Sequence, residues 1–425
     1  MTSTEVKKAR TLRGAVRVPG DKSASHRAFM ISALADGVST IKGASNGEDV
    51  ERTREIVKLL GATISHQDGG WSVVGPTSGL SGSAVPLDCG NSGTAMRLLA
   101  GLLTGVTGTH HLIGDQSLMQ RPMERVVVPL RSMGAQITAS ESGTAPIKIE
   151  GGLPLAGIDF EVPTPSAQVK SAVLFAALGA SSPTVIRESI RTRSTTEEML
   201  LASLIDVVSE DQGAGRFITI NPGRPMTRHW TIPGDPSQAA FFAVLGAIHG
   251  NASIGVINLL NEPERTGFMQ VLKRMGGLVS LEQRSDSFAL RVRTSSLHST
   301  EIHSSEIPSV DEVPVLAIAA AAATGVTAFR DMGELRVKES DRFLGSMKLA
   351  QAIGCETWAE GDDFYIRGLG SADHFSAFTL DAGLDHRIVM SAAVAATAGN
   401  GGTIVNWKTV ESSYPAFFED LISIQ

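Results

Sequence analysis

Residues 59–64 read LLGATI, and this pattern recurs along the chain. Each copy has an apolar residue, a glycine and a small residue; the copies are LLGATI at 59–64, SMGAQI at 132–137, RMGGLV at 274–279 and, in weaker form, AIGC at 352–355. Glycine often closes a helix because it adopts the left-handed backbone conformation without strain. Each copy therefore predicts the end of a helix followed by the start of a strand.

The chain has a second recurring feature, a polar turn followed by a helix of small apolar residues. These helices are expected to begin roughly every 70 residues, near Ser23, Gly93, Ser166, Ser237, Asp311 and Asp385. Their alanines allow close packing, so the helices are expected to be buried. Units that alternate strand and helix periods predict an α/β protein made of two groups of three repeats, and they disfavour a propeller or a solenoid.

Composition excludes several classes of protein. The chain has 425 residues, which is long enough for two or three domains. Its net charge of -7 and aromatic content of 5% argue against nucleic-acid binding, which uses a basic face and stacking side chains. Cys89 and Cys355 are far apart and lack clustered histidines, so we expect no disulfide, zinc or other metal site.

Two segments bear on localisation. Residues 1–13 are polar and basic, unlike a secretory signal. The longest apolar run, 313–329, is interrupted by Pro314 and Thr324 and is shorter than the roughly 20 residues of a membrane span. We therefore expect a cytoplasmic protein.

The first repeat contains a candidate anion site at residues 19–27, PGDKSASHR. Backbone N–H groups at a helix N-terminus attract phosphate, and Ser23 and Arg27 share one helix face. Lys22 adds a charge on a flexible side chain, whereas His26 is expected to be structural. The alternative is an ordinary capped helix with solvated charges, the more frequent meaning of such a stretch alone.

The second repeat reads LDCGNSGTAMR at 87–97, and its glycines would let the backbone approach a ligand closely. The spacing is neither GxGxxG nor a Walker A loop, and a simple tight turn is the alternative. Cys89 is expected to pack rather than react. Further on, Arg121 precedes Pro122, which suits the first turn of a helix.

The other helix starts also carry polar and charged residues: Ser166, Ala167, Gln168 and Lys170, with Arg191 and Arg193 after the next strand, then Asp311 and Glu312, and finally Asp385, His386 and Arg387. Within 336–342, Lys338 and Arg342 are expected to lie one helical turn apart. Hydroxyl, amide and guanidinium donors suit a phosphorylated sugar. A mixed-charge run alone is more often a solvated helix face, but recurrence at equivalent repeat positions favours a ligand role.

Together these segments resemble the 5-enolpyruvylshikimate-3-phosphate synthase family over essentially the whole chain. The matching segments follow the family's order at 19–27, 90–97, 114–123, 166–171, 336–342 and 385–387. The resemblance implies a two-lobed inside-out α/β barrel in which each lobe contains three βαβαββ repeats. The lobes would be residues 20–233 and residues 1–19 plus 234–425. Pro-Gly turns at 19–20 and 233–234 would form the hinge.

The resemblance implies transfer of the enolpyruvyl group of phosphoenolpyruvate to the 5-hydroxyl of shikimate 3-phosphate, with release of phosphate, in chorismate and aromatic amino-acid biosynthesis. It further implies a monomer that needs no cofactor. Shikimate 3-phosphate would contact Lys22, Ser23, Arg27, Ser166, Ala167, Gln168, Arg193, Asp311 and Lys338. Phosphoenolpyruvate would contact Lys22, Gly93, Arg121, Gln168, Arg342 and Arg387. Because Gly93 has no side chain, the inhibitor glyphosate should also fit.

The reaction needs an acid and a base. Asp311 is the candidate for taking the hydroxyl proton, and Lys22 and Glu339 are candidates for protonating C3 and later removing a proton from it. Two positions depart from one branch of the family: Ala167 replaces a serine and Ser412 a lysine. Residues 409–415 and Lys408 are therefore left out of the expected site.

Two other functions stay open at this point. The sister enzyme that acts on UDP-N-acetylglucosamine has the same architecture, but it has Lys-Asn where this chain has Lys22-Ser23. It also has a cysteine in the loop corresponding to residues 110–120, which has none here. A phosphosugar sensor without turnover is the second alternative, and the presence of Lys22, Asp311 and Glu339 argues against it.

Overall fold

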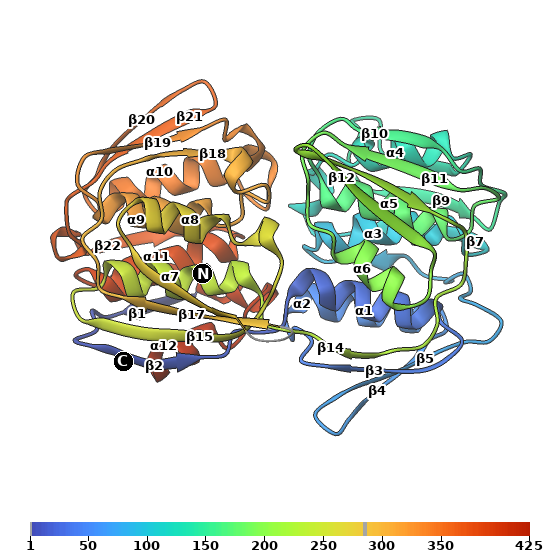
Figure 1. Ribbon diagram of the computed structural model, residues 1–425, viewed down its shortest axis with the longest axis horizontal. Coiled ribbons are helices and arrows are strands. Elements are labelled where there is room, and N and C mark those ends of the chain that lie inside the picture. The colour runs from blue at the N-terminus through green and yellow to red at the C-terminus, as the bar shows by residue number, and fades with distance from the viewer. Residues whose placement is uncertain (1, 284–286) are drawn as a thin grey trace. The chain divides into compact units, whose positions relative to one another are not determined.

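The computed structural model describes residues 2–283 and 287–425. The chain forms two compact units. We call Gly20–Ile232 the continuous unit, and the residues up to Pro19 together with Pro233–Gln425 the split unit. Each unit is described separately (Figure 1).

The continuous unit contains three four-stranded sheets with the same topology. In each, an edge strand runs parallel to its neighbour and the next two strands are antiparallel. In spatial order, the first sheet is β14 (His229–Thr231), β3 (Gly37–Lys42), β5 (Gly70–Gly75) and β4 (Thr63–Gln67); the second is β6 (Leu87–Asp88), β7 (Gly108–Ile113), β9 (Ile147–Gly151) and β8 (Gln136–Thr138); the third is β10 (Asp159–Val162), β11 (Thr184–Glu188), β13 (Gly215–Ile220) and β12 (Val207–Gln212). The repeated order confirms the repeats predicted from sequence.

The helices of the continuous unit fall into two sets. The inner set is buried almost throughout and consists of α1 (Lys22–Leu34), α3 (Gly93–Leu103) and α5 (Ala167–Ala177). The second set is more exposed and consists of α2 (Glu48–Leu59), α4 (Glu124–Ser132) and α6 (Thr195–Ala202). A Cβ atom on Gly101 would lie 1.9 Å from the carbonyl oxygen of Ala172, so α3 and α5 pack closely only because this position is glycine. Figure 1 shows α3 and α5 inside the sheets of this unit.

In the residues described, the split unit has two four-stranded sheets of this topology and a third sheet of three strands, in which one edge strand is parallel and the other antiparallel to the central strand. Its sheets are β16 (Leu278–Gln283), β17 (Ser287–Arg293), β15 (Ala252–Leu260) and β2 (Leu12–Val16); β18 (Glu301–His303), β19 (Val326–Arg330), β21 (Asp363–Arg367) and β20 (Glu356–Glu360); and β1 (Ser3–Val6), β23 (Gly402–Val405) and β22 (Phe378–Asp381). Every residue is buried in the inner helices α7 (Pro236–Ile248), α9 (Val313–Ala322) and α11 (His386–Ala398). The other helices are α8 (Gly267–Arg274), α10 (Arg342–Ala352) and α12 (Phe417–Ser423).

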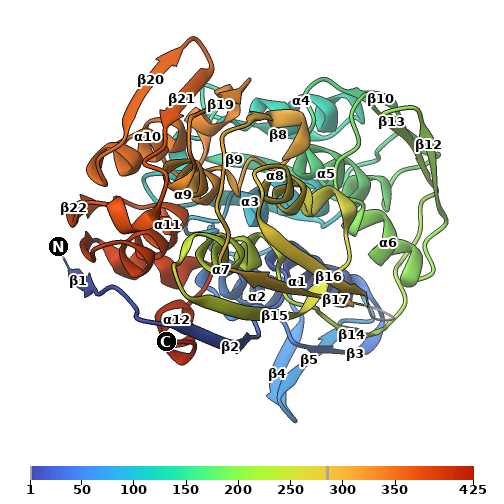
Figure 2. The same ribbon diagram turned by 60° about the vertical axis from the view of Figure 1, so that its left-hand side comes forward.

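The first two strands of the chain belong to the split unit. β2 runs parallel to β15, and Figure 2 shows them side by side. β1 pairs antiparallel with β23. The unit is therefore completed by residues that precede the whole continuous unit in sequence.

Short 3₁₀ segments connect these elements: η1 (Leu118–Gln120), η2 (Pro263–Arg265), η3 (Ser304–Glu306), η4 (Gly333–Val337), η5 (Ala372–His374) and η6 (Trp407–Ser412). In the described ranges, no helix is both long and apolar enough to cross a membrane.

The glycine closures predicted from sequence are confirmed. The glycines of the four copies have φ values between +93° and +105° and follow α2, α4, α8 and α10: Gly61, Gly134, Gly276 and Gly354. The predicted starts of the inner helices are also confirmed to within one or two residues.

Two local predictions are wrong. Pro122 is not in a first helical turn, because it forms a bridge with Thr144 and α4 begins only at Glu124. Lys338 and Arg342 do not share a helix, since Lys338 has extended backbone after η4 and Arg342 is the first residue of α10.

Candidate active site

In the continuous unit, the first turn of α1 is tied to α2. Asp21 caps the helix by accepting from the Ala24 N–H group at 2.7 Å. Lys22 Nζ lies 2.9 Å from Asp49 Oδ2, and both side chains are mostly buried. The mobile charge expected at Lys22 is therefore held by a carboxylate that the sequence analysis did not single out.

Arg27, which lies in the second turn of α1, is almost completely buried. Its Nη1 donates to the carbonyl oxygen of Ser23 (2.8 Å), its Nε to Thr196 Oγ1 (2.5 Å) and its Nη2 to Ser171 Oγ (2.6 Å). Arg193 Nη1 donates to Ser23 Oγ at 2.7 Å. The structure thus brings together the predicted residues Ser23, Arg27 and Arg193.

Thr196 and Ser171 were missed by the sequence analysis. Thr196 lies in the first turn of α6, and its hydroxyl is 2.6 Å from that of Ser171 on α5. Ser171 is the last residue of the 166–171 segment that resembles the family, and this position could have indicated its role. Arg191, noted alongside Arg193, pairs with Asp211 instead.

The starts of α3 and α5 are linked through Gln168. Gln168 Nε2 donates to Thr94 Oγ1 at 2.9 Å, and Gln168 Oε1 accepts from Arg97 Nη1 at 2.5 Å. Arg97 Nη2 also donates to the carbonyl oxygen of Pro122 at 3.2 Å. Arg97 thereby joins Gln168 to the residue that follows Arg121, although it was not among the expected site residues.

Gly93 lies beside two guanidinium groups. A Cβ atom at this position would lie 3.1 Å from Arg121 Nη1 and 3.4 Å from Arg97 Nη1. Arg121 Nη2 donates to Asn91 Oδ1 at 2.6 Å. The glycine therefore leaves room for Arg121 at the N-terminus of α3.

The start of α5 uses its residues for capping and packing. Ser166 Oγ accepts from the Val169 N–H group at 3.4 Å, and Ala167 is buried. The thiol of Cys89, which follows β6, is fully buried, and burial raises its pKa. This agrees with the packing role expected for Cys89.

In the split unit, the fully buried Arg342 is surrounded by carboxylates. Its Nη1 lies 2.9 Å from Asp311 Oδ1, its Nη2 2.6 Å from Glu339 Oε2 and its Nε 2.8 Å from Asp385 Oδ2. Asp385 caps α11 by accepting from the Arg387 N–H group at 2.9 Å, and it also accepts from Ser340 Oγ at 2.8 Å. Of the predicted residues of the fifth and sixth repeats, four thus form one cluster, namely Asp311, Glu339, Arg342 and Asp385, whereas Lys338 pairs with Glu334 at 3.7 Å.

Asp311 contacts a second arginine, since Arg387 Nη2 lies 3.2 Å from Asp311 Oδ2. Burial raises the pKa of Asp311, but the opposing charges of Arg387, Arg342 and Lys338 prevail and lower it below its ordinary value. The pKa of Lys338 is lowered, chiefly by burial. Asp311 is therefore a carboxylate at neutral pH, the form in which it can accept a proton.

The 407–412 segment packs against the start of α11 without a lysine at 412. Ser412 Oγ lies 3.1 Å from His386 Nδ1, and it donates to the carbonyl oxygen of Thr409 at 2.9 Å. Lys408 is exposed.

The fold has relatives of known structure. The enolpyruvyl transferase NikO from Streptomyces tendae matches 99% of this chain and 96% of its own, with a TM-score of 0.80 at 18% identity. The fold is that of an enolpyruvyl transferase. An EPSP synthase structure from Acinetobacter baumannii matches 99% of this chain and 98% of its own, with a TM-score of 0.85 at 35% identity.

Sequence comparison defines the family. The model of EPSP synthase (3-phosphoshikimate 1-carboxyvinyltransferase) matches residues 6–421. The 3-phosphoshikimate 1-carboxyvinyltransferases of Streptococcus uberis and Gluconobacter oxydans are 40% and 39% identical to the chain. The match with the Streptococcus uberis protein covers 97% of this chain and 97% of that protein. The match with the Gluconobacter oxydans protein covers 96% of this chain and 94% of that protein. The chain belongs to the EPSP synthase family.

Family membership confirms the predicted transferase activity. The protein transfers the enolpyruvyl group of phosphoenolpyruvate to shikimate 3-phosphate in the pathway to aromatic amino acids.

Proposed function

We propose that the cluster at the start of α1 binds the phosphosugar substrate. The observation that carries this proposal is the convergence of Arg27 and Arg193 on Ser23, because guanidinium and hydroxyl donors at a helix N-terminus suit a phosphate. In the full assignment, shikimate 3-phosphate is bound by Lys22, Ser23, Arg27, Ser166, Ala167, Gln168, Arg193, Asp311 and Lys338.

Phosphoenolpyruvate carries both a phosphate and a carboxylate, so we assign to it the sites richest in arginine. The assigned residues are Lys22, Gly93, Arg121, Gln168, Arg342 and Arg387. Support comes from the position of Arg121 beside Gly93 and from the way Arg97 fixes Gln168. Glyphosate, as a small anion, is proposed to compete for the same residues.

The proposed reaction is an addition followed by an elimination. The sugar 5-hydroxyl attacks C2 of phosphoenolpyruvate and loses its proton to Asp311, while C3 gains a proton from Lys22 or Glu339. The resulting tetrahedral intermediate then loses a proton from C3 and its phosphate, which restores the double bond. No cofactor enters these steps.

Substrate binding should make Asp311 a better base. In the structure, Arg342 and Arg387 stabilise its charged form and lower its pKa. Anionic groups of phosphoenolpyruvate that engage these arginines would weaken that effect. The pKa of Asp311 would then rise toward the range in which a carboxylate accepts a proton readily.

We also propose that the protein is a monomer and that it works in the cytoplasm.

Residues 19–20 and 233–234 are proposed to act as a hinge. Because the ligands assigned to shikimate 3-phosphate belong to both units, its binding should compact the protein. Small-angle scattering at saturation measures this, and an unchanged radius of gyration would exclude closure.

Acceptor specificity is tested by phosphate release from phosphoenolpyruvate, using purified and dialysed protein. We expect release with shikimate 3-phosphate and none with UDP-N-acetylglucosamine. Release with the nucleotide sugar alone would mean the sister reaction, and binding without release would mean a sensor.

A further inference from the structure

A buried ion cluster adjoins the hydroxyl partners of Arg27, because Lys170 precedes Ser171 and Glu197 follows Thr196. Lys170 Nζ, on α5, is 2.8 Å from Glu188 Oε2 at the end of β11 and 2.7 Å from Glu197 Oε1 on α6. The Lys170 side chain is fully buried, and those of the two glutamates are 1% and 4% exposed. We call Lys170, Glu188 and Glu197 the lysine triad.

The lysine triad fixes both ends of one short segment. Thr192 Oγ1 donates a hydrogen bond to Glu188 Oε1, and Glu197 pairs with Lys170. Between these two anchors lie Arg193 and Thr196, which contact Ser23 and Arg27. The triad thus holds the two ends of segment 192–197, and residues between these ends contact α1.

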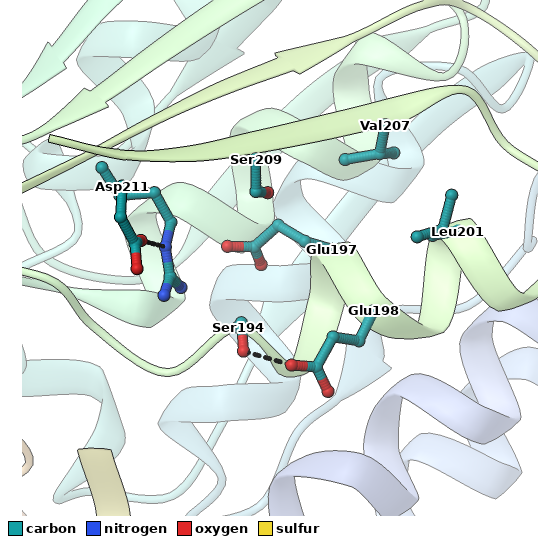
Figure 3. Close-up of a pocket in the computed structure, with 8 residues that line it drawn as sticks. Ser194, Glu197, Glu198, Leu201, Val207, Ser209 and Asp211 are labelled. Carbon is teal, nitrogen blue, oxygen red and sulfur yellow. Dashed lines mark hydrogen bonds and ion pairs between the residues drawn. The ribbon is translucent and has the colours of Figure 1, made fainter. Parts of the chain in front are cut away.

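The segment joins a loop to the first turn of a helix. β11 ends at Glu188 and α6 begins at Thr195, so residues 189–194 lie outside both elements. A pocket of about 380 Å³ borders the start of α6 and reaches Glu197; Figure 3 shows this residue among the lining side chains, with Ser194 bonded to Glu198. The Thr192–Glu188 hydrogen bond and the Lys170–Glu197 ion pair are buried contacts at the two ends of 192–197, next to this loop and pocket.

We propose that Lys170, Glu188, Glu197 and Thr192 are positioning residues for substrate binding. They keep segment 192–197 in the conformation in which Arg193 and Thr196 orient Ser23 and Arg27. The inference rests on the proposed role of Ser23 and Arg27 in binding shikimate 3-phosphate. A displacement of about 1 Å is enough to weaken such a site strongly.

Thr192→Val is the sharpest test because it removes one hydroxyl and leaves the buried charges in place. We expect the KM for shikimate 3-phosphate, and its Kd measured by calorimetry, to rise roughly tenfold, as for the loss of one buried hydrogen bond. The KM for phosphoenolpyruvate should stay within about twofold. Thr192→Ser restores the hydroxyl and should restore the affinity.

Glu188→Gln and Lys170→Met disturb the triad more strongly, and thermal unfolding shows whether they fold. The matched control is Glu150→Gln, which breaks the exposed Lys148–Glu150 pair (2.9 Å) in the same unit and should change neither KM. An unchanged KM for shikimate 3-phosphate in Thr192→Val, or an equal rise in both KM values, would overturn the inference.

Ser23→Ala separates this inference from the proposed function. If Ser23→Ala weakens shikimate 3-phosphate binding while Thr192→Val does not, the substrate site stands and the positioning role fails. If Ser23→Ala itself has no effect, the proposed substrate site is wrong, and the positioning role fails with it.

Discussion

The two units share a repeat topology, apart from one three-stranded sheet in the split unit, but their buried arginines have different partners. In the continuous unit, Arg27 donates to two hydroxyls and a carbonyl. In the split unit, Arg342 lies against three carboxylates, those of Asp311, Glu339 and Asp385. The same fold therefore binds a buried guanidinium group through hydroxyls in the continuous unit and through carboxylates in the split unit.

The difference in partners suits the surroundings of the two arginines to different tasks. Hydroxyls orient a guanidinium group without taking up protons at neutral pH, so the contacts of Arg27 suit the recognition of an anion. Carboxylates both orient an arginine and exchange protons, so the cluster around Arg342 suits acid–base chemistry. The proposed base, Asp311, therefore lies in the split unit together with Arg342, whereas Arg27, which is bound by hydroxyls, lies in the continuous unit.

The largest expected effect comes from breaking the carboxylate cluster. Arg342→Met leaves three carboxylates close together, and should lower the free energy of unfolding by about 3–5 kcal/mol. Thr196→Val removes only a neutral acceptor from Arg27, and should lower the free energy of unfolding by about 1 kcal/mol. Urea titration of both variants measures this contrast, and equal losses would show that the two arginines are held alike.

Asp311→Ala tests the proton-transfer side of the comparison. Turnover should fall by roughly 100-fold or more, because a general base is lost, while shikimate 3-phosphate binding stays measurable. Steady-state kinetics and calorimetry measure the two quantities. Near-normal turnover would remove Asp311 from its role, and the matched variant Asp363→Ala, on β21, should retain activity.

Gly93→Ala tests the anion-binding side. The added Cβ would lie 3.1 Å from Arg121 Nη1, which is closer than ordinary contact, so Arg121 must move slightly. We expect inhibition by glyphosate to weaken by about tenfold, equivalent to roughly 1.4 kcal/mol, with a smaller change in the KM for phosphoenolpyruvate. Equal inhibition of both proteins would contradict the assignment of Gly93.

The smallest expected effect is a difference in acid sensitivity. Asp311 and Asp385 both have lowered pKa values in the folded protein. The unfolded chain therefore binds more protons, and the stability that these groups contribute is present above a pH of about 4 and is lost as the pH falls further. Asp311→Asn should flatten this loss between pH 4 and 3 in urea titrations, whereas an unchanged slope would show that Asp311 does not contribute.

Features that depend on neighbours in sequence could be predicted. The inner helices begin where polar turns precede small apolar residues, and the glycines after α2, α4, α8 and α10 have the expected left-handed conformation. These features are local, because a cap or a glycine closure involves residues only a few positions apart. Arg27 could be placed with Ser23 for the same reason, since they are four residues apart on one helix.

Features that depend on partners distant in sequence could not be predicted. Thr196 is 169 positions from Arg27 and Asp49 is 27 from Lys22, so no local pattern reveals these contacts. The lysine triad also joins three separate elements. Lys338 and Arg342 were misplaced because the four-residue spacing of a helix was assumed where η4 ends and α10 begins.

The pairing of β1 with β23 has a consequence for synthesis of the chain. Ser3 pairs with Val405, so the first strand leaves the ribosome about 400 residues before its partner. At 5–20 residues per second, this separation corresponds to roughly 20 to 80 seconds. During that time Gly20–Ile232 can fold completely, while the first strand keeps an unpaired edge open to other chains.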